Sequence, residues 1–75
     1  MSGPVKRSVN IAGHSTSITL EPIFWDALVR AAEDEALPLN ALVARIDADR
    51  VTDEGLPNLA SAIRVWLFRR AAGRG

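Results

Sequence analysis

Hydrophobic side chains recur with two different periods on either side of Glu21. Over residues 15–20 they alternate with small hydroxyl residues, which is typical of a strand with one apolar and one polar face. From Pro22 onward they recur at helical spacing, at Phe24, Leu28 and Ala32. The pattern predicts a strand over residues 15–20 that leads directly into a helix over residues 22–36, because proline fits the first turn of a helix.

Two further helices are predicted. Leu37-Pro38 ends the first helix, because the residue before a proline avoids the α region. Apolar residues at helical spacing then predict a second helix over residues 39–50. Asn58 is a good N-cap for a third helix, so that residues 58–71 form the last element. Residues 1–4 and 72–75 are expected to be flexible.

Residues 5–11 alternate imperfectly, because Arg7 interrupts the apolar positions. This stretch is either an extended arm or a second strand, and Ala12-Gly13-His14 supplies a turn before residues 15–20. A strand as short as residues 15–20 is not stable alone and needs a partner strand. Because the chain offers few candidates, the pattern favours a second copy as the source of that partner.

The composition indicates one small globular domain that is not an enzyme. The 75 residues include no cysteine and one histidine, so that neither a thiolate site nor a histidine metal cluster is expected, and no cofactor is implied. No glycine-rich phosphate loop or catalytic constellation is present. No apolar run is long enough for a membrane span, and the amino end does not resemble a signal peptide. The absence of cysteine fits the reducing cytoplasm.

The net charge is zero, but the charges are segregated. Residues 1–20 carry two cations and no acid. Residues 21–54 carry nine acids and three arginines, and residues 55–75 carry four arginines and no acid. Because nucleic-acid binding depends on the local surface, the neutral total does not argue against a basic contact face at either end.

Strand, helix, turn and helix in this order over residues 15–50 resemble the ribbon-helix-helix repressors. A closer resemblance covers nearly the whole chain. The string Ile11-Ala-Gly-His-Ser-Thr-Ser-Ile-Thr-Leu-Glu21, then Phe24-Trp25, Ile46-Asp47, Arg50 and Asn58-Leu-Ala-Ser-Ala-Ile-Arg64, is similar to short bacterial ribbon-helix-helix proteins. DNA binding is ascribed to those proteins largely from their fold.

The resemblance implies a mainly α fold with a short β-ribbon. It implies an intertwined ribbon-helix-helix homodimer, here with an added C-terminal helix. In that family two protomers pair their strands into an antiparallel ribbon, and the helices of both chains interlock beneath it. The dimer core would then comprise the apolar residues Ile18, Leu20, Phe24, Trp25, Leu28, Leu42, Val43 and Ile46.

The resemblance also implies a transcriptional regulator of the bacterial cytoplasm, associated with the nucleoid when bound to double-stranded DNA. The ribbon enters the major groove, where Ser15, Ser17 and Thr19 face the bases. The amino end of the second helix, with Asn40, lies against the phosphate backbone. The two-fold axis predicts an inverted-repeat site, with a higher oligomer on DNA as a further possibility.

Several interpretations stay open at this point. Lys6 and Arg7 are either a solvated terminus or an arm that contacts DNA, and His14 is either a turn residue or a phosphate ligand. The hydroxyl face of residues 15–20 is either solvated surface or a DNA face. Two rivals compete with DNA binding: an antitoxin-like or adaptor dimer that docks protein, and a structural homo-oligomer assembled through the third helix.

Overall fold

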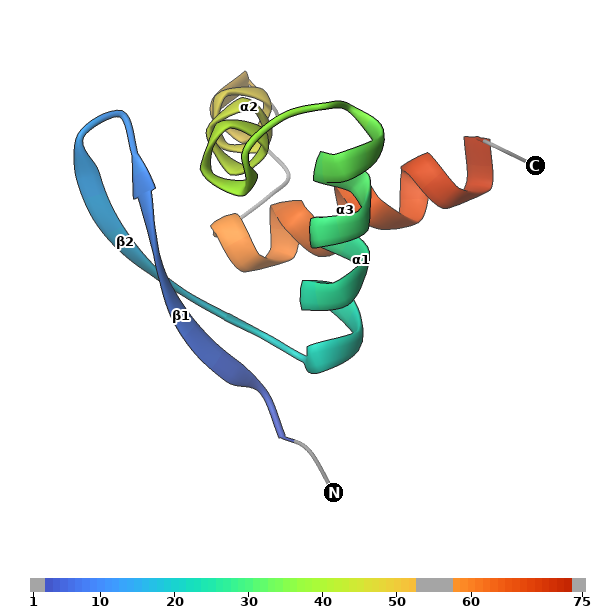
Figure 1. Ribbon diagram of the computed structural model, residues 1–75, viewed down its shortest axis with the longest axis horizontal. Coiled ribbons are helices and arrows are strands. Elements are labelled where there is room, and N and C mark those ends of the chain that lie inside the picture. The colour runs from blue at the N-terminus through green and yellow to red at the C-terminus, as the bar shows by residue number, and fades with distance from the viewer. Residues whose placement is uncertain (1–2, 53–57, 74–75) are drawn as a thin grey trace.

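The computed structural model describes residues 3–52 and 58–73. A β-hairpin, β1 (Val5–Ile11) and β2 (His14–Leu20), is followed by three helices: α1 (Pro22–Asp34), α2 (Leu39–Thr52) and α3 (Leu59–Gly73). The hairpin lies along one side of the helices, and the C-terminal half of α3 extends toward the opposite side (Figure 1). The order confirms the predicted ribbon, two helices and added third helix.

The partner of the predicted strand comes from the same chain. β1 pairs antiparallel with β2, from Val5 opposite Leu20 to Ile11 opposite His14. Ala12 and Gly13 join the strands with φ angles of 51° and 85°. Two consecutive positive φ values are typical of a type I′ turn, which matches the twist of a hairpin. Of the two interpretations of residues 5–11, the second strand is therefore the correct one, and β2 does not depend on a second copy for its pairing.

The core lies between one face of the hairpin and the three helices. Val9, Ile18 and Leu20 are buried on the hairpin side. The helices cover them with a continuous apolar cluster: Trp25, Leu28, Ala31, Ala32, Leu42, Val43, Ile46, Ala62, Ile63 and Leu67. The third helix thus completes the core of the single chain.

Trp25 joins the hairpin to α1. Its side chain is 1% exposed, and its indole N–H donates a hydrogen bond of 2.9 Å to the carbonyl oxygen of Val5. The Arg7 guanidinium lies over the same ring, 5.1 Å from its centroid. A buried indole needs a partner for its N–H, so this bond fixes the start of β1 against the helix.

The ends of the helices follow from local chemistry. α1 ends two residues before the predicted residue 36, because Ala36 has a φ of 55°. The Leu37 N–H donates to the Ala32 carbonyl and the Ala36 N–H to the Glu33 carbonyl, which is a Schellman motif with alanine at the left-handed position. At α3, the Ser61 N–H donates to Asn58 Oδ1 at 2.8 Å, which confirms the predicted cap.

Two other boundaries differ from the sequence prediction. α2 continues to Thr52 rather than residue 50, and α3 continues to Gly73, so that residues 72 and 73 are helical rather than loose. Residues 1, 2, 74 and 75, which were expected to be flexible, lie outside the described residues, as does the stretch from residue 53 to residue 57.

Seven of the eight residues predicted to form a dimer core are buried within the single chain. The eighth, Phe24, is partly buried against the same cluster. The reason is that β1 and α3 contribute to the same apolar cluster, β1 through Val9 and α3 through Ala62, Ile63 and Leu67. The burial of these residues needs no second copy, and the homodimer itself stays a prediction.

Candidate nucleic-acid interface

The hairpin has one buried and one exposed face. The exposed one, the outer face, consists of six residues whose side chains alternate with the buried ones. In register they pair across the ribbon as Lys6 with Thr19, Ser8 with Ser17, and Asn10 with Ser15. All six are exposed, and all six are polar or positively charged. No acidic residue occurs before Glu21, so no carboxylate of the hairpin repels an approaching anion.

The outer face offers a graded set of hydrogen-bonding groups. Serine and threonine hydroxyls donate and accept over a short reach. The Asn10 amide presents a donor and an acceptor side by side, and the Lys6 ammonium presents three donors. Lys6 forms no ion pair in the described part of the chain. An array of this kind suits recognition of base edges and phosphate oxygens.

The structure brings together four of the residues predicted from the sequence to contact DNA. Lys6, Ser15, Ser17 and Thr19 share the outer face. Arg7 does not belong to it, because its register position alternates with Lys6 and its guanidinium covers the Trp25 ring. Lys6 and Arg7 lie on different faces because adjacent residues of a strand point to opposite sides of the sheet.

His14 also occupies a register position on the opposite face from Ser15. It lies beside the turn and lines a hollow of about 380 Å³ together with Thr16, Asp47 and Arg50. The Arg50 guanidinium is paired there with the Asp47 carboxylate at 2.8 Å. The hollow lies between the tip of the hairpin and α2, and not on the outer face.

Asn40 is exposed in the first turn of α2. The Ala41 and Leu42 N–H groups both donate to the Pro38 carbonyl, so that Pro38 begins the hydrogen bonding of this helix. The first N–H groups of a helix have no intrahelical acceptor and carry the positive end of the dipole. Asn40 therefore stands at an electropositive helix end, apart from the outer face.

Two residues of the outer face, Ser8 and Asn10, were not among the predicted contacts. The signal was present in the sequence, since Val5, Val9 and Ile11 share one parity and leave the even-numbered residues on the other face. Arg7, which has the apolar parity, obscured the alternation. The explanation is that Arg7 covers an aromatic ring with its guanidinium and so occupies an apolar-side position as a cation.

Arginines of the helices are engaged in ion pairs between elements. Arg64 donates from Nη2 and Nε to Oε1 of Glu21, at 2.9 and 3.1 Å. Glu35 accepts from both Arg45 and Arg70. A hydrogen bond from its own backbone N–H, and then the Arg64 guanidinium, lower the pKa of Glu21 below its ordinary value. These pairs hold the helices together and are separate from the outer face.

Other kinds of site find little support among residues 3–52 and 58–73. No group of three or more histidines and acids there could hold a metal ion. None of the helices in that part of the chain is long and apolar enough to cross a membrane.

Comparison with known proteins identifies the family. The model of a ribbon-helix-helix domain matches residues 4–71. The chain belongs to the ribbon-helix-helix family. Among solved structures, an uncharacterized protein from Bordetella pertussis Tohama I is similar, with 31% identity and a TM-score of 0.76. The match covers 97% of this chain and 62% of that protein, so this chain spans about three fifths of its length. The chain matches none of the curated proteins.

The structure of this ribbon-helix-helix domain contains elements beyond the strand, helix and helix of the family order. β2, α1 and α2 supply the strand, helix and helix of the family order, and β1 and α3 are added at either end. The ribbon of this domain is therefore a hairpin within one chain, and the third helix seals the apolar side of the domain. Both additions lie within the matched residues.

Proposed function

We propose that this ribbon-helix-helix domain is a sequence-specific DNA-binding protein and a transcriptional regulator, and that it inserts the hairpin into the major groove. The observation that carries the proposal is the outer face of six exposed polar residues on a two-stranded ribbon, without any acid in the hairpin. It acts by binding and has no catalytic role.

The dimensions of the ribbon fit the groove. Neighbouring strands lie about 4.8 Å apart, and the major groove of B-DNA is about 12 Å wide. A two-stranded hairpin with its side chains enters such a groove, whereas a four-stranded sheet, with about 14 Å between its outer strands, is too wide. The proposal is therefore that each copy inserts its own hairpin.

The chemistry of the outer face assigns different tasks to its residues. Asn10 is suited to a bidentate contact with adenine, and Lys6 to guanine or to a phosphate. Ser8, Ser15, Ser17 and Thr19 contact either base edges or phosphate oxygens at short range. Asn40 and the first turn of α2 contribute a backbone contact that orients the domain.

The functional unit is proposed to be a homodimer on DNA. The domain measures 34 × 34 × 27 Å. Successive turns of the major groove on one side of B-DNA are about 34 Å apart. Two copies side by side thus match the spacing of an inverted repeat whose half-sites are one turn apart. Such a protein acts in the bacterial cytoplasm, at the nucleoid when bound.

Selection from a random duplex pool at about 100 mM salt tests this proposal. The expected result is enrichment of an inverted repeat with half-site centres about 10 base pairs apart. Asn10→Ala should relax the preference at one position of each half-site, whereas Lys6→Ala should weaken binding to all sequences. A folded protein that enriches nothing, and that is not retained on DNA even at about 50 mM salt, would refute the proposal.

A second function is favoured by one observation: Lys6 is the only charged residue of the outer face, since Arg7 is turned toward Trp25. A single cation supplies little attraction for phosphate, and an adaptor or antitoxin-like dimer that docks protein would need none. Salt dependence separates the two, because DNA affinity falls steeply between about 50 and 200 mM salt and docking of neutral polar surfaces does not.

A further inference from the structure

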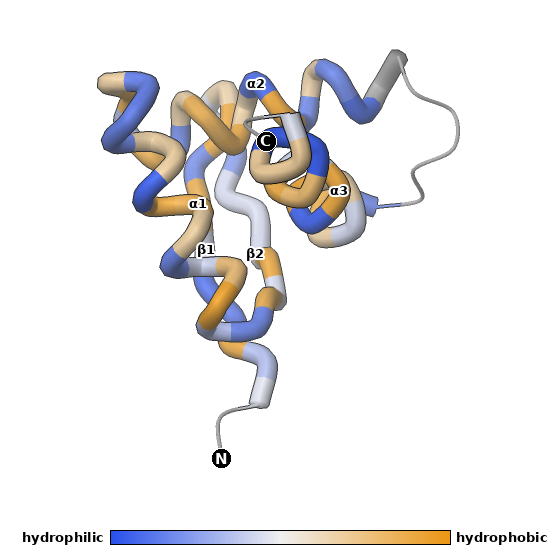
Figure 2. Tube along the Cα trace, turned by 90° about the vertical axis from the view of Figure 1, so that its right-hand side faces the viewer, coloured by the Kyte–Doolittle hydropathy of each residue, from blue (hydrophilic) through white to orange (hydrophobic). Residues whose placement is uncertain are grey.

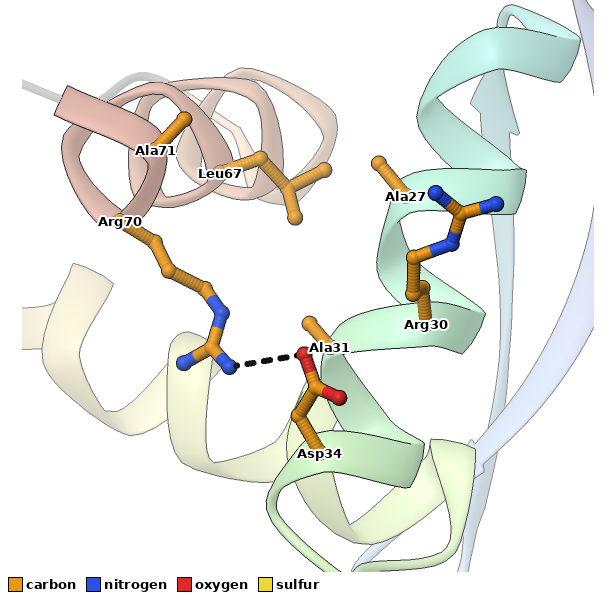
Figure 3. A pocket seen from close by; sticks show the side chains of 7 residues that line it. All are labelled: Ala27, Arg30, Ala31, Asp34, Leu67, Arg70 and Ala71. Carbon is orange, nitrogen blue, oxygen red and sulfur yellow. Dashed lines mark hydrogen bonds and ion pairs between the residues drawn. The ribbon is translucent and has the colours of Figure 1, made fainter. Parts of the chain in front are cut away.

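A groove between α1 and α3 lies on the side of the molecule away from the hairpin. It has a volume of about 260 Å³ and is lined by Ala27, Arg30, Ala31, Asp34, Leu67, Arg70 and Ala71 (Figure 3). In Figure 2 this side faces the viewer, with the end of α3 in front and the strands behind. The groove is thus separate from the outer face of the hairpin.

The interior of the groove is apolar. Ala31 and Leu67 are buried and form its floor, and Ala27 and Ala71 stand at its sides. Alanine side chains are too short to fill the space between two helices, so an apolar hollow remains. Sites for small molecules are typically apolar hollows with a few polar groups that orient the ligand.

The architecture limits the length of an occupant. Ion pairs connect the two helices toward both ends of the groove: Arg64 with Glu21 at 2.9 Å, and Arg70 with Asp34 at 3.4 Å, the latter drawn in Figure 3. A peptide laid along the groove would have to pass over these pairs, whereas a small molecule lies between them. A cavity of about 150 Å³ holds benzene, so a hollow of about 260 Å³ has room for one ring with a short side chain.

The rim of the groove carries one cation whose charge is not neutralised. Arg70 pairs with both Asp34 and Glu35, and Glu35 also pairs with Arg45. The two arginines and two acids of this network balance one another. Arg30 forms no ion pair in the part of the chain that the structure describes. The charge that remains for a ligand at this rim is therefore positive.

Arg30 stands between the groove and a second hollow on α1, which is lined also by Asp26, Val29 and Glu33. Neither acid is ion-paired with it, and all of these residues belong to the described part of the chain. Its exposed guanidinium can thus meet a ligand without losing a partner. A carboxylate matches the fork of guanidinium N–H donors, and a monoanion matches the single charge.

We propose that the groove between α1 and α3 binds a small monocarboxylic acid that carries one aromatic ring or a short apolar chain. The apolar part fills the groove, and the carboxylate pairs with Arg30 at the rim. Such a ligand does not compete with DNA, because the groove and the outer face lie on different sides of the molecule. It also stabilises the fold, since it binds the folded chain and not the unfolded one.

Titration of the ¹⁵N-labelled chain with 3-phenylpropionate at about 50 mM salt, followed by nuclear magnetic resonance, tests the proposal. Amide signals of Ala27, Ala31, Leu67 and Ala71 should shift and saturate, with a Kd of about 0.1–5 mM. The phenyl ring should give cross-peaks to the Ala27 and Ala31 methyl groups. The neutral 3-phenylpropanol, which has the same shape, should bind about two- to fivefold more weakly, and 3-phenylpropylamine more weakly still.

Variants separate the apolar part of the site from the charged part. Arg30→Gln should weaken binding of the acid about two- to fivefold and leave binding of the alcohol unchanged. Ala27→Leu, which fills the groove, should weaken both at least about fivefold. Ala48→Leu, the same substitution on the exposed side of α2, is the matched control and should leave both affinities unchanged. The amide spectrum of each variant shows whether it is folded.

Three outcomes would overturn the proposal. The first is an absence of saturable shifts in the groove up to about 20 mM ligand, which is the result if another chain covers it. The second is equal affinity for the acid, the alcohol and the amine. The third is wild-type affinity in a folded Ala27→Leu variant. None of these measurements involves DNA, so their failure and the failure of the proposed function are distinguishable.

Discussion

The fourteen residues of the two strands divide between two faces of the hairpin, and the two faces have different roles. The inner face packs against the helices: Val9, Ile18 and Leu20 are buried, and the Trp25 indole N–H donates to the Val5 carbonyl at the start of β1. The outer face has no tertiary contact to maintain, because its side chains are directed to solvent. Residues with no packing role are free to be chosen for binding, and here they are polar throughout.

The difference between the buried inner face and the exposed outer face predicts different effects for substitutions at adjacent positions of a strand. Since the strand period is two, a change of one residue along β2 moves a side chain from the core to the outer face. The same chemical change should therefore damage folding at one position and binding at the next. Variants at adjacent positions thus distinguish the two faces.

The largest effect is expected for Ile18→Asp. The side chain at this position is 2% exposed, and burying a carboxylate there without a partner should cost more than about 4 kcal/mol. A domain of 75 residues has only roughly 4–11 kcal/mol of stability, so the variant should be largely unfolded. Far-ultraviolet circular dichroism and urea titration measure this.

The matched control is Thr19→Asp, one residue further along β2 and exposed. Its stability should change by about 1 kcal/mol or less, while affinity for the selected duplex falls at least about tenfold through repulsion by phosphate. If Thr19→Asp unfolds the chain, or if Ile18→Asp keeps its structure, the assignment of the two faces is wrong.

A smaller effect separates Lys6 from Arg7. Lys6→Ala should leave stability unchanged and reduce the salt slope of DNA binding by about 0.9 for each phosphate that is no longer neutralised. Arg7→Ala should cost about 0.5–1 kcal/mol of stability, because the guanidinium no longer covers Trp25, and should leave the slope nearly unchanged. An equal reduction of the slope in both variants would show that Arg7 reaches the DNA as well.

The smallest effect concerns the turn that sets the register of the two faces. Ala12 has a φ of 51°, a region that glycine adopts without the steric cost of a Cβ atom. Ala12→Gly should therefore stabilise the hairpin by up to about 1 kcal/mol, measured by thermal melting. Ala48→Gly, in the exposed part of α2, should destabilise by about the same amount, and a matching destabilisation in Ala12→Gly would contradict the turn assignment.

Much of the helical part of this domain could be predicted from the sequence. Pro22, Pro38 and Asn58 mark the starts of the three helices to within a residue, because their effects on the backbone are local. The end of α1 was harder to predict from the sequence. Its Schellman motif uses Ala36 where glycine is usual, so the sequence carried no stop signal at that residue.

The partner of β2 was the main point that sequence reasoning could not settle. Residues 5–11 are a candidate strand in the sequence, but Arg7 interrupts their apolar parity, and the pattern favours a second copy as the source of the partner strand. The cause is a tertiary contact, the placement of Arg7 over Trp25, which lies far along the chain in the first helix. Because Arg7 lies over Trp25, it is not part of the outer face. Its charge at an apolar-side position also makes the alternation hard to recognise in the sequence, so that Ser8 and Asn10 are not predicted as residues of the outer face.

The sequence by itself determined the order of the elements, the family to which it is similar and the polar character of residues 15, 17 and 19, because period and capping are local properties. The tertiary structure decided that the ribbon closes within one chain and that α3 completes the core. It also placed the Arg7 guanidinium over the Trp25 ring while Lys6 stayed on the outer face. These features depend on pairing and packing between residues far apart in the chain, and side-chain spacing along the sequence does not encode such contacts.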